Sequence, residues 1–218
     1  LNPGVLVDPA PLDADLRPGP GRDALPVTPV HALTRDAGSF AAAVHRCVGV
    51  GACRNLRVGS MCPSFKVTRD EVHSTRGRAR VLAEMLRGST VTDGWRSDEV
   101  LDALDLCLSC KACARECPVN VDMATYKAEF LHRHYAGRVR PMAHYSMGWL
   151  PLWSRMLSGA PARFVNAALA RERVAGVVKR VAGIEPRRRM VRFAEESLQR
   201  WYRRRGPRPG NGTRVVLW

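Results

Sequence analysis

Seven cysteines in two groups constrain this chain more than any other feature of its sequence. The second group, Cys107, Cys110, Cys113 and Cys117, is followed by Pro118, which gives the spacing C-x2-C-x2-C-x3-C-P. In this pattern three close thiolates bind one iron-sulfur cubane and the fourth reaches a different cluster. Two intervening residues let a turning backbone direct successive sulfurs at different irons, and the proline turns the last cysteine away. The spacing therefore predicts two neighbouring clusters.

The first group repeats the last step of this pattern. It consists of Cys47, Cys53 and Cys62, and the last of them is again followed by a proline, Pro63. Because Cys62 and Cys117 both stand directly before a proline, we expect each of them to serve the other group's cluster. The resulting ligand sets are Cys62, Cys107, Cys110 and Cys113 for the first cluster, and Cys47, Cys53 and Cys117 for the second.

The second cluster is one ligand short. Aligning Cys47 and Cys53 with a C-x2-C-x2-C half-motif places Val50 where the middle cysteine would stand, and valine cannot bind iron. Two outcomes fit this gap: a 3Fe-4S cluster without that corner, or a 4Fe-4S cluster whose fourth iron is held by solvent or by a side chain such as His45. The first cluster, with four thiolates, is expected to be 4Fe-4S.

Zinc and disulfides are the alternative uses of these cysteines. C-x2-C pairs often bind structural zinc, but four cysteines within eleven residues and a trailing proline suit a cube better than a tetrahedral ion. An odd number of cysteines leaves at least one unpaired in any intrachain disulfide scheme. The chain begins at Leu1 and shows no export signal, so we expect metal-binding thiols in the cytoplasm.

The net charge of +15 lies mainly toward the C-terminus. Residues 171–218 hold fourteen Lys/Arg against four Glu, so this tail supplies ten of the fifteen charges. The whole chain has only four lysines, and arginine bias in a GC-rich genome explains the charge as well as an anionic partner does. No apolar stretch reaches the roughly 20 residues of a membrane span, which leaves peripheral contact with the inner face of a membrane as the only membrane option.

Helical periodicity predicts a mainly α fold. Ser39 is expected to cap a helix over residues 40–45, and Ser97 to cap one that delivers the chain into Cys107. Thr68 and Glu71 match a capping box for a helix that ends near residue 87. The expected buried stripes are Val81, Leu82, Met85 and Leu86 in one helix and Val100, Leu101 and Leu104 in the next.

Further helices are expected in the second half of the chain. One covers residues 122–135 and is closed by Gly137, and others lie around residues 142–157, 162–182 and 190–204. The expected inward residues of the first are Tyr126, Phe130 and Leu131. In the next, Tyr145, Trp149 and Trp153 recur at four-residue spacing, which favours a core-facing stripe over a docking surface.

Several charged residues are candidates for adjusting a cluster's potential. Net charge and hydrogen bonding set that potential, and Lys111 lies inside the second motif, where a tuning role and simple exposure are equally good explanations. For Arg76, Arg78 and Arg80 we expect a solvated helix face.

These features divide the chain into four expected parts. Residues 1–38, rich in Pro, Gly and Asp, are expected to be the end of an upstream domain and an extended linker. Residues 39–137 form the cluster domain, residues 138–210 a basic helical connector, and residues 211–218 the start of a truncated C-terminal domain. The chain is expected to be a piece of a longer protein.

Five runs resemble the iron-sulfur region of bacterial FAD-linked oxidases and dehydrogenases. They are CVGVGACRN, MCPSF, STRGRARVL, LDLCLSCKACARECPVNVDMATYKAEF and HYSMGWLP. This family includes D-lactate and D-2-hydroxyglutarate dehydrogenase-like proteins and relatives of the glycolate oxidase iron-sulfur subunit. The five-residue spacing between Cys47 and Cys53 is also similar to the 3Fe-4S half of succinate dehydrogenase iron-sulfur subunits.

The resemblance implies an alpha-helical ferredoxin-like, two-cluster domain within a larger enzyme. That enzyme would oxidise a 2-hydroxy acid at FAD in an upstream flavin domain and pass electrons through the clusters to a quinone or other acceptor. A cysteine-rich C-terminal domain would follow, and no catalytic residue is expected in this segment. There are two rival functions. One is a nucleic-acid-binding protein with a structural cluster, which only the arginine-rich tail suggests, and the other is a heterodisulfide-reductase-like electron-transfer subunit.

Overall fold

Helices account for all the regular secondary structure in residues 25, 27–206 and 212, which are the residues that this computed structural model describes. The mainly α fold class is thereby confirmed. The chain divides into two compact units, residues 1–137 and residues 138–218.

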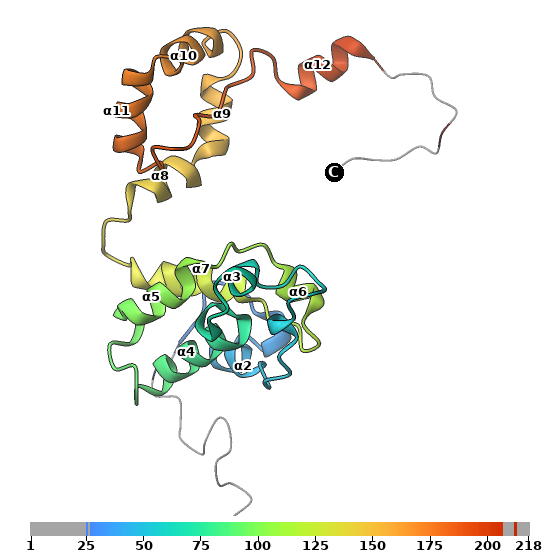
Figure 1. Ribbon diagram of the computed structural model, residues 1–218, viewed down its shortest axis with the longest axis vertical. Helices are drawn as coiled ribbons and strands as arrows, with labels where there is room; N and C mark the ends of the chain where they lie inside the picture. Colours follow the sequence, from blue (N-terminus) through green and yellow to red (C-terminus); the bar gives the residue numbers. More distant parts are fainter. Residues whose placement is uncertain (1–24, 26, 207–211, 213–218) are drawn as a thin grey trace, which may run out of the picture. The chain divides into compact units, whose positions relative to one another are not determined.

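The first unit is built around α4 (Thr75–Arg87), which packs against α2 (Phe40–His45), α5 (Asp98–Asp105) and α7 (Met123–His134) (Figure 1). Two short helices, α3 (Pro63–Thr68) and α6 (Ala112–Glu116), carry parts of the cysteine loops. Single 3-10 turns complete it at η1 (Thr34–Asp36), η2 (Ala52–Arg54), η3 (Glu71–His73) and η4 (Gly94–Arg96). The core includes Phe40, Val44, Leu82, Met85, Leu86, Val100, Leu104, Tyr126 and Phe130.

Two of the three expected helix caps are confirmed. The Ser39 hydroxyl accepts a hydrogen bond from the backbone of Ala42, and Ser97 does the same for Val100. The capping box at Thr68 is wrong, because α3 ends at that residue and α4 starts only at Thr75, capped by Ser74. A serine directly before the apolar stripe, with its oxygen on the third helical N–H, satisfies one of the unpaired donors at the helix start.

Residues 27–33 lie against α7 through the buried carboxylate of Glu129. This side chain accepts hydrogen bonds from the backbone N–H groups of Val30 and His31 and from the His31 ring, and it pairs with Arg133 at 3.0 Å. Burial opposes ionisation of Glu129, but these donors together lower its pKa below the ordinary value. The last part of the expected linker is therefore fastened to the cluster unit.

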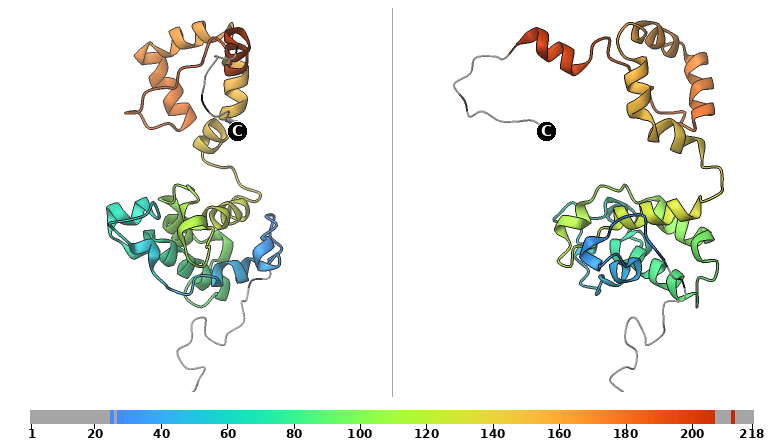
Figure 2. Two further views of the ribbon diagram at one scale, coloured as in Figure 1. Left: turned by 90° about the vertical axis from the view of Figure 1, so that its right-hand side faces the viewer. Right: turned by 180° about the vertical axis from the view of Figure 1, so that it is seen from behind.

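The second unit contains α8 (Met142–Gly148), α9 (Leu150–Leu157), α10 (Ala162–Leu169) and α11 (Glu172–Ala182), which follow one another around an open ring (Figure 2). The single helix expected over residues 142–157 breaks at Trp149, because Pro151 has no N–H and its ring crowds the preceding turn. The helix expected over residues 162–182 also breaks, at Arg171, and nothing in its sequence explains this.

The last expected helix is shorter than predicted. Only α12 (Leu198–Arg205) is helical, capped by Ser197. The segment before it runs beside α10, where the Asn166 side chain exchanges two hydrogen bonds with the backbone of Phe193. The short apolar run predicted at residues 215–217 lies outside the described residues.

The aromatic stripe of α8 and α9 is not a core. Tyr145, Trp149 and Trp153 are 40%, 57% and 38% exposed, and among the described residues of this unit only Ala162 and Ala175 are buried. Tyr145 and Trp153 instead line an apolar cavity of about 600 Å³ inside the ring. No helix in the described part of the chain is long and apolar enough to span a membrane.

Candidate metal centre

All seven cysteines lie in the first unit as free thiols, on or beside short helices. Cys53 in η2, Cys62 directly before α3 and Cys113 in α6 are buried. Cys47, Cys107 and Cys117 are half-buried, and Cys110 is exposed. The thiols thus lie within short helices or in the loops beside them, where the backbone can turn toward a bound group.

Cys117 lies with the first group of cysteines. Cys47, Cys53 and Cys117 line one small cavity, and Val50 lines it as well. Three thiols from sequence segments more than sixty residues apart therefore line one hollow, together with Val50, the residue expected from the sequence to stand in place of a fourth.

The loop before Cys62 is tied to α6 of the second motif. The Glu116 carboxylate accepts hydrogen bonds from the backbone N–H groups of Ser60 at 2.7 Å and Met61 at 3.2 Å, and from the Ser60 hydroxyl. These donors lower the pKa of Glu116. The chain just before Cys62 is thereby held against the helix that carries Cys113.

The N-terminus of α4 is directed at the cysteines of the first group. The backbone N–H of Thr75 donates to the Cys62 sulfur at 3.0 Å, and the Thr75 hydroxyl lies 2.9 Å from it. The backbone of Arg76 is one of the groups that lower the pKa of Cys53. Because unpaired N–H groups and the helix dipole make a helix start a favourable place for negative charge, this turn favours sulfur in its thiolate form.

Cys53 and Cys62 are also in hydrogen-bond contact with each other, although we assigned them to different clusters. The hydrogen bond from Cys62 is the main reason that the pKa of Cys53 falls to about 6, and the same contact raises the pKa of Cys62. A pair coupled in this way readily carries one negative charge. The two proposed ligand sets therefore meet at this contact.

The second motif has a strained backbone around its exposed cysteine. Ser109 and Lys111, on either side of Cys110, both have positive φ, at 52° and 58°. Left-handed residues in such loops turn successive N–H groups into a concave anion-binding nest, and non-glycine residues keep this conformation only where the surroundings impose it. Desolvation raises the pKa of Cys113, although the backbone N–H of Met123 donates to its sulfur.

Arg78 is buried, which corrects the expectation of a solvated face. Its side chain donates to the carbonyl oxygen of Ala103 at 2.8 Å and to the Ser64 hydroxyl at 3.0 Å, and only 2% of the residue is exposed. Lys127 donates to the carbonyls of Asp105 and Cys107 nearby. Both cations therefore cap the C-terminal end of α5, where carbonyls lack helical partners and the dipole is negative.

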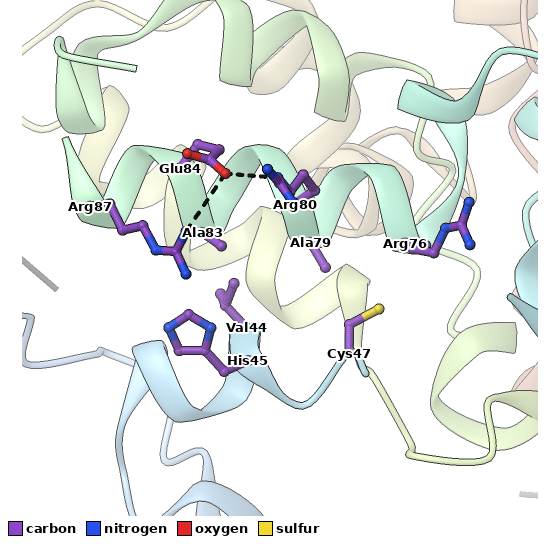
Figure 3. A pocket seen from close by; sticks show the side chains of 9 residues that line it. All are labelled: Val44, His45, Cys47, Arg76, Ala79, Arg80, Ala83, Glu84 and Arg87. Carbon is purple, nitrogen blue, oxygen red and sulfur yellow. Dashed lines mark ion pairs between the residues drawn. The ribbon is translucent and has the colours of Figure 1, made fainter. Parts of the chain in front are cut away.

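His45 and Lys111, two of the side chains weighed from the sequence, lie outside the cysteine cavity's lining. His45 lines a groove between α2 and α4 that Cys47 and Arg76 also line, and Figure 3 shows its ring near Arg87 while the Cys47 sulfur points the other way, toward the Arg76 end of α4. Lys111 is exposed and pairs with Asp122 at 2.9 Å. Arg80, the third arginine considered, is half-exposed and pairs with Glu84.

Three contributors at the site had not been singled out from the sequence as site residues: Thr75, Glu116 and Lys127. Ser74 directly precedes the apolar stripe of α4, and a serine in that position is a cap signal. The start of α4 at Thr75 could therefore have been predicted. Glu116 and Lys127 reach segments fifty-five and twenty residues away, and no local pattern announces such contacts.

The donor chemistry fits iron-sulfur clusters. Thiols gather around one hollow, backbone N–H groups point at sulfur, and a nest-like loop surrounds Cys110, all of which suit an anionic, thiolate-bound group. A family model described as "4Fe-4S dicluster domain" matches residues 43–121. Residues 43–121 form a 4Fe-4S dicluster domain. Such a domain implies two iron-sulfur clusters.

The curated relatives of this chain are longer proteins, and the chain matches only a part of each. D-2-hydroxyglutarate dehydrogenase of Pseudomonas putida is 32% identical over 78% of this chain and 20% of its own length. The Escherichia coli protein of the same name is 26% identical over 79% of the chain and 20% of its length. The Escherichia coli glycolate oxidase iron-sulfur subunit is 32% identical over 34% of the chain and 16% of its length. No solved structure gives a significant match.

The chain thus spans about a fifth of the length of the dehydrogenases that it matches. The dicluster domain is related to them and to the glycolate oxidase iron-sulfur subunit, as the resemblance implied. It is an electron-transfer region homologous to part of a CH-OH oxidoreductase.

Proposed function

We propose that this segment relays electrons one at a time between a flavin domain and a downstream acceptor, through two clusters with crossed ligands. The first is a 4Fe-4S cluster bound by Cys62, Cys107, Cys110 and Cys113, and the second is bound by Cys47, Cys53 and Cys117. The observation that carries the crossed assignment is the shared cavity of Cys47, Cys53 and Cys117. The Glu116 contacts, which hold the Cys62 loop on α6, support it from the other side.

The parent enzyme, on this proposal, is an FAD-dependent 2-hydroxy acid dehydrogenase in the cytoplasm. A bound cluster accepts a single electron, whereas a reduced flavin gives up two, so a paired relay removes the mismatch. The chain's own residues bind the clusters, shield Cys53, Cys62 and Cys113 from water and supply N–H donors to sulfur. Residues 1–38 would end the flavin domain, and residues 211–218 would begin the cysteine-rich C-terminal domain. The enzyme would pass its electrons to a quinone or another carrier.

The basic test is whether the purified chain holds reducible clusters. We expect iron and acid-labile sulfide from anaerobic preparations, and EPR signals that change when dithionite is added. A folded product that contains zinc, or no metal, would contradict the proposal.

The crossed ligand sets predict opposite effects for two substitutions. Cys117→Ala should remove the EPR signal of the second cluster and leave that of the first, whereas Cys62→Ala should do the reverse. EPR of the oxidised and reduced variants, with circular dichroism to verify the helical fold, measures this. If Cys117→Ala instead abolishes the signal of the four-cysteine cluster, the ligands are sequential and the crossed assignment is wrong.

A cysteine in place of Val50 should complete the second site. Because Val50 lines the cavity with Cys47, Cys53 and Cys117, Val50→Cys is expected to abolish any 3Fe-4S signal and raise the iron content by about one atom per chain. Val48→Cys is the matched control, since Val48 and Val50 are both exposed valines but Val48 lies outside that lining. Equal iron content and equal spectra in the two variants would mean that position 50 does not face the second cluster.

A further inference from the structure

The first turn of α4 touches both proposed ligand sets with consecutive residues. Thr75 donates its backbone N–H to Cys62, which is assigned to the first cluster, and the next residue, Arg76, lines the cavity of Cys47, Cys53 and Cys117, which are assigned to the second. One helix end is therefore placed to act on two redox centres.

Thr75 gives the first set a second donor. Its hydroxyl lies 2.9 Å from the Cys62 sulfur, and the residue is only 2% exposed. A buried hydrogen bond to a thiolate is stronger than one in water. It stabilises the reduced cluster more than the oxidised one, because reduction adds negative charge to the sulfurs.

Arg76 gives the second set a nearby positive charge. Its side chain lines the cavity of Cys47, Cys53 and Cys117, and one of its terminal nitrogens lies 3.8 Å from the position that a Cβ on Gly51 would take. The guanidinium is thus held over the loop that contains Val50.

Glu71 fixes Arg76 in this place without cancelling the local charge. Its two carboxylate oxygens bind Arg76 at 2.6 Å and Arg54 at 2.9 Å. Two arginines share one carboxylate, so the group keeps one net positive charge directly after Cys53. These side chains are 28% to 48% exposed, and solvent therefore weakens but does not remove their effect.

We propose that the first turn of α4 sets the two reduction potentials separately, with Thr75 raising that of the first cluster and the Arg54–Glu71–Arg76 group raising that of the second. The residues act through hydrogen bonding and net charge, which are two of the quantities that determine cluster potentials. The inference rests on the proposed function, because it assumes the crossed ligand sets.

The test is an EPR-monitored redox titration of the full chain with its clusters bound. Thr75 also lines the cavity of Cys47, Cys53 and Cys117, but its hydroxyl contacts the Cys62 sulfur. Thr75→Val removes the hydroxyl and keeps the shape, so it should make the first midpoint more negative and change the second much less. Arg76→Gln should lower the second midpoint, by about a tenfold fall in the reduction constant, which corresponds to about 59 mV for one electron. Glu71→Gln should raise the same midpoint, because it removes the negative charge.

Arg80→Gln is the matched control, since Arg80 lies one turn further along α4 and pairs with Glu84. The two reduction midpoints of the Arg80→Gln variant should equal those of the unmodified protein. Intact EPR signals with unchanged midpoints in Thr75→Val and Arg76→Gln would overturn this inference and leave the proposed function standing. Shifts of equal size in Arg76→Gln and Arg80→Gln would also overturn it, because they would show a general charge effect. Absence of clusters from the unmodified chain would instead overturn the proposed function itself.

Discussion

Gly77→Ala is expected to lower the free energy of unfolding of the cluster unit by about 3 kcal/mol or more, although glycine to alanine inside a helix usually stabilises it. A Cβ at this position would lie 2.0 Å from the carbonyl oxygen of Glu71 and 2.9 Å from the Cα of Val72. Both are backbone atoms, so η3 or the start of α4 must move. Because that start carries the donors to Cys62, we also expect the variant to hold less iron.

Gly176→Ala is the control for this substitution. Gly176 lies inside α11 with negative φ, and an added Cβ would meet nothing within 4 Å. There the ordinary effect should apply, a stabilisation of about 0.4–1 kcal/mol. Thermal and urea unfolding followed by circular dichroism, with iron analysis of each preparation, compares the two. A Gly77→Ala protein that unfolds like the unmodified one and holds as much iron would contradict this prediction. It would show that the backbone near Glu71 can move away from the added Cβ without loss of stability.

The helical fold and the presence of a two-cluster domain could be predicted because their signals are local. The cysteine and proline spacing is a complete motif within twelve residues, and the serine caps at Ser39 and Ser97 adjoin the helices that they start. The seven ligands and their division between two clusters stay a prediction.

What the sequence did not reveal depends on contacts between distant segments. Arg78 was expected in solvent because arginine usually is, yet it shares the buried face of Thr75 and Leu82 at helical spacing. Its burial becomes understandable only once the end of α5 is seen to need a donor there. The exposed stripe of Tyr145 and Trp153 shows the reverse, since helical spacing indicates an apolar face but not what covers it.

The buried guanidinium of Arg78 leads to the second large prediction. Arg78→Met keeps much of the side-chain volume but removes the donors to Ala103 and Ser64. The carbonyl of Ala103 then lies at a helix end without its donor, and an unsatisfied buried polar group costs about 1–3 kcal/mol. With the Ser64 contact and the favourable charge at the end of α5 also lost, we expect a total destabilisation of about 2–5 kcal/mol.

Arg80→Met separates this effect from the loss of any arginine on α4. Arg80 is 49% exposed on its side chain and pairs with Glu84 at i,i+4, an arrangement worth about 0.3–0.5 kcal/mol. Urea unfolding of both variants should therefore give a difference of several-fold between the two losses of stability. Because α5 leads directly into Cys107 and α3 follows Cys62, Arg78→Met should also weaken the first cluster before the second. Equal losses of stability in both variants would mean that the hydrogen bonds of Arg78 add no more to stability than the exposed ion pair of Arg80. The carbonyl groups at the end of α5 would then be satisfied in another way.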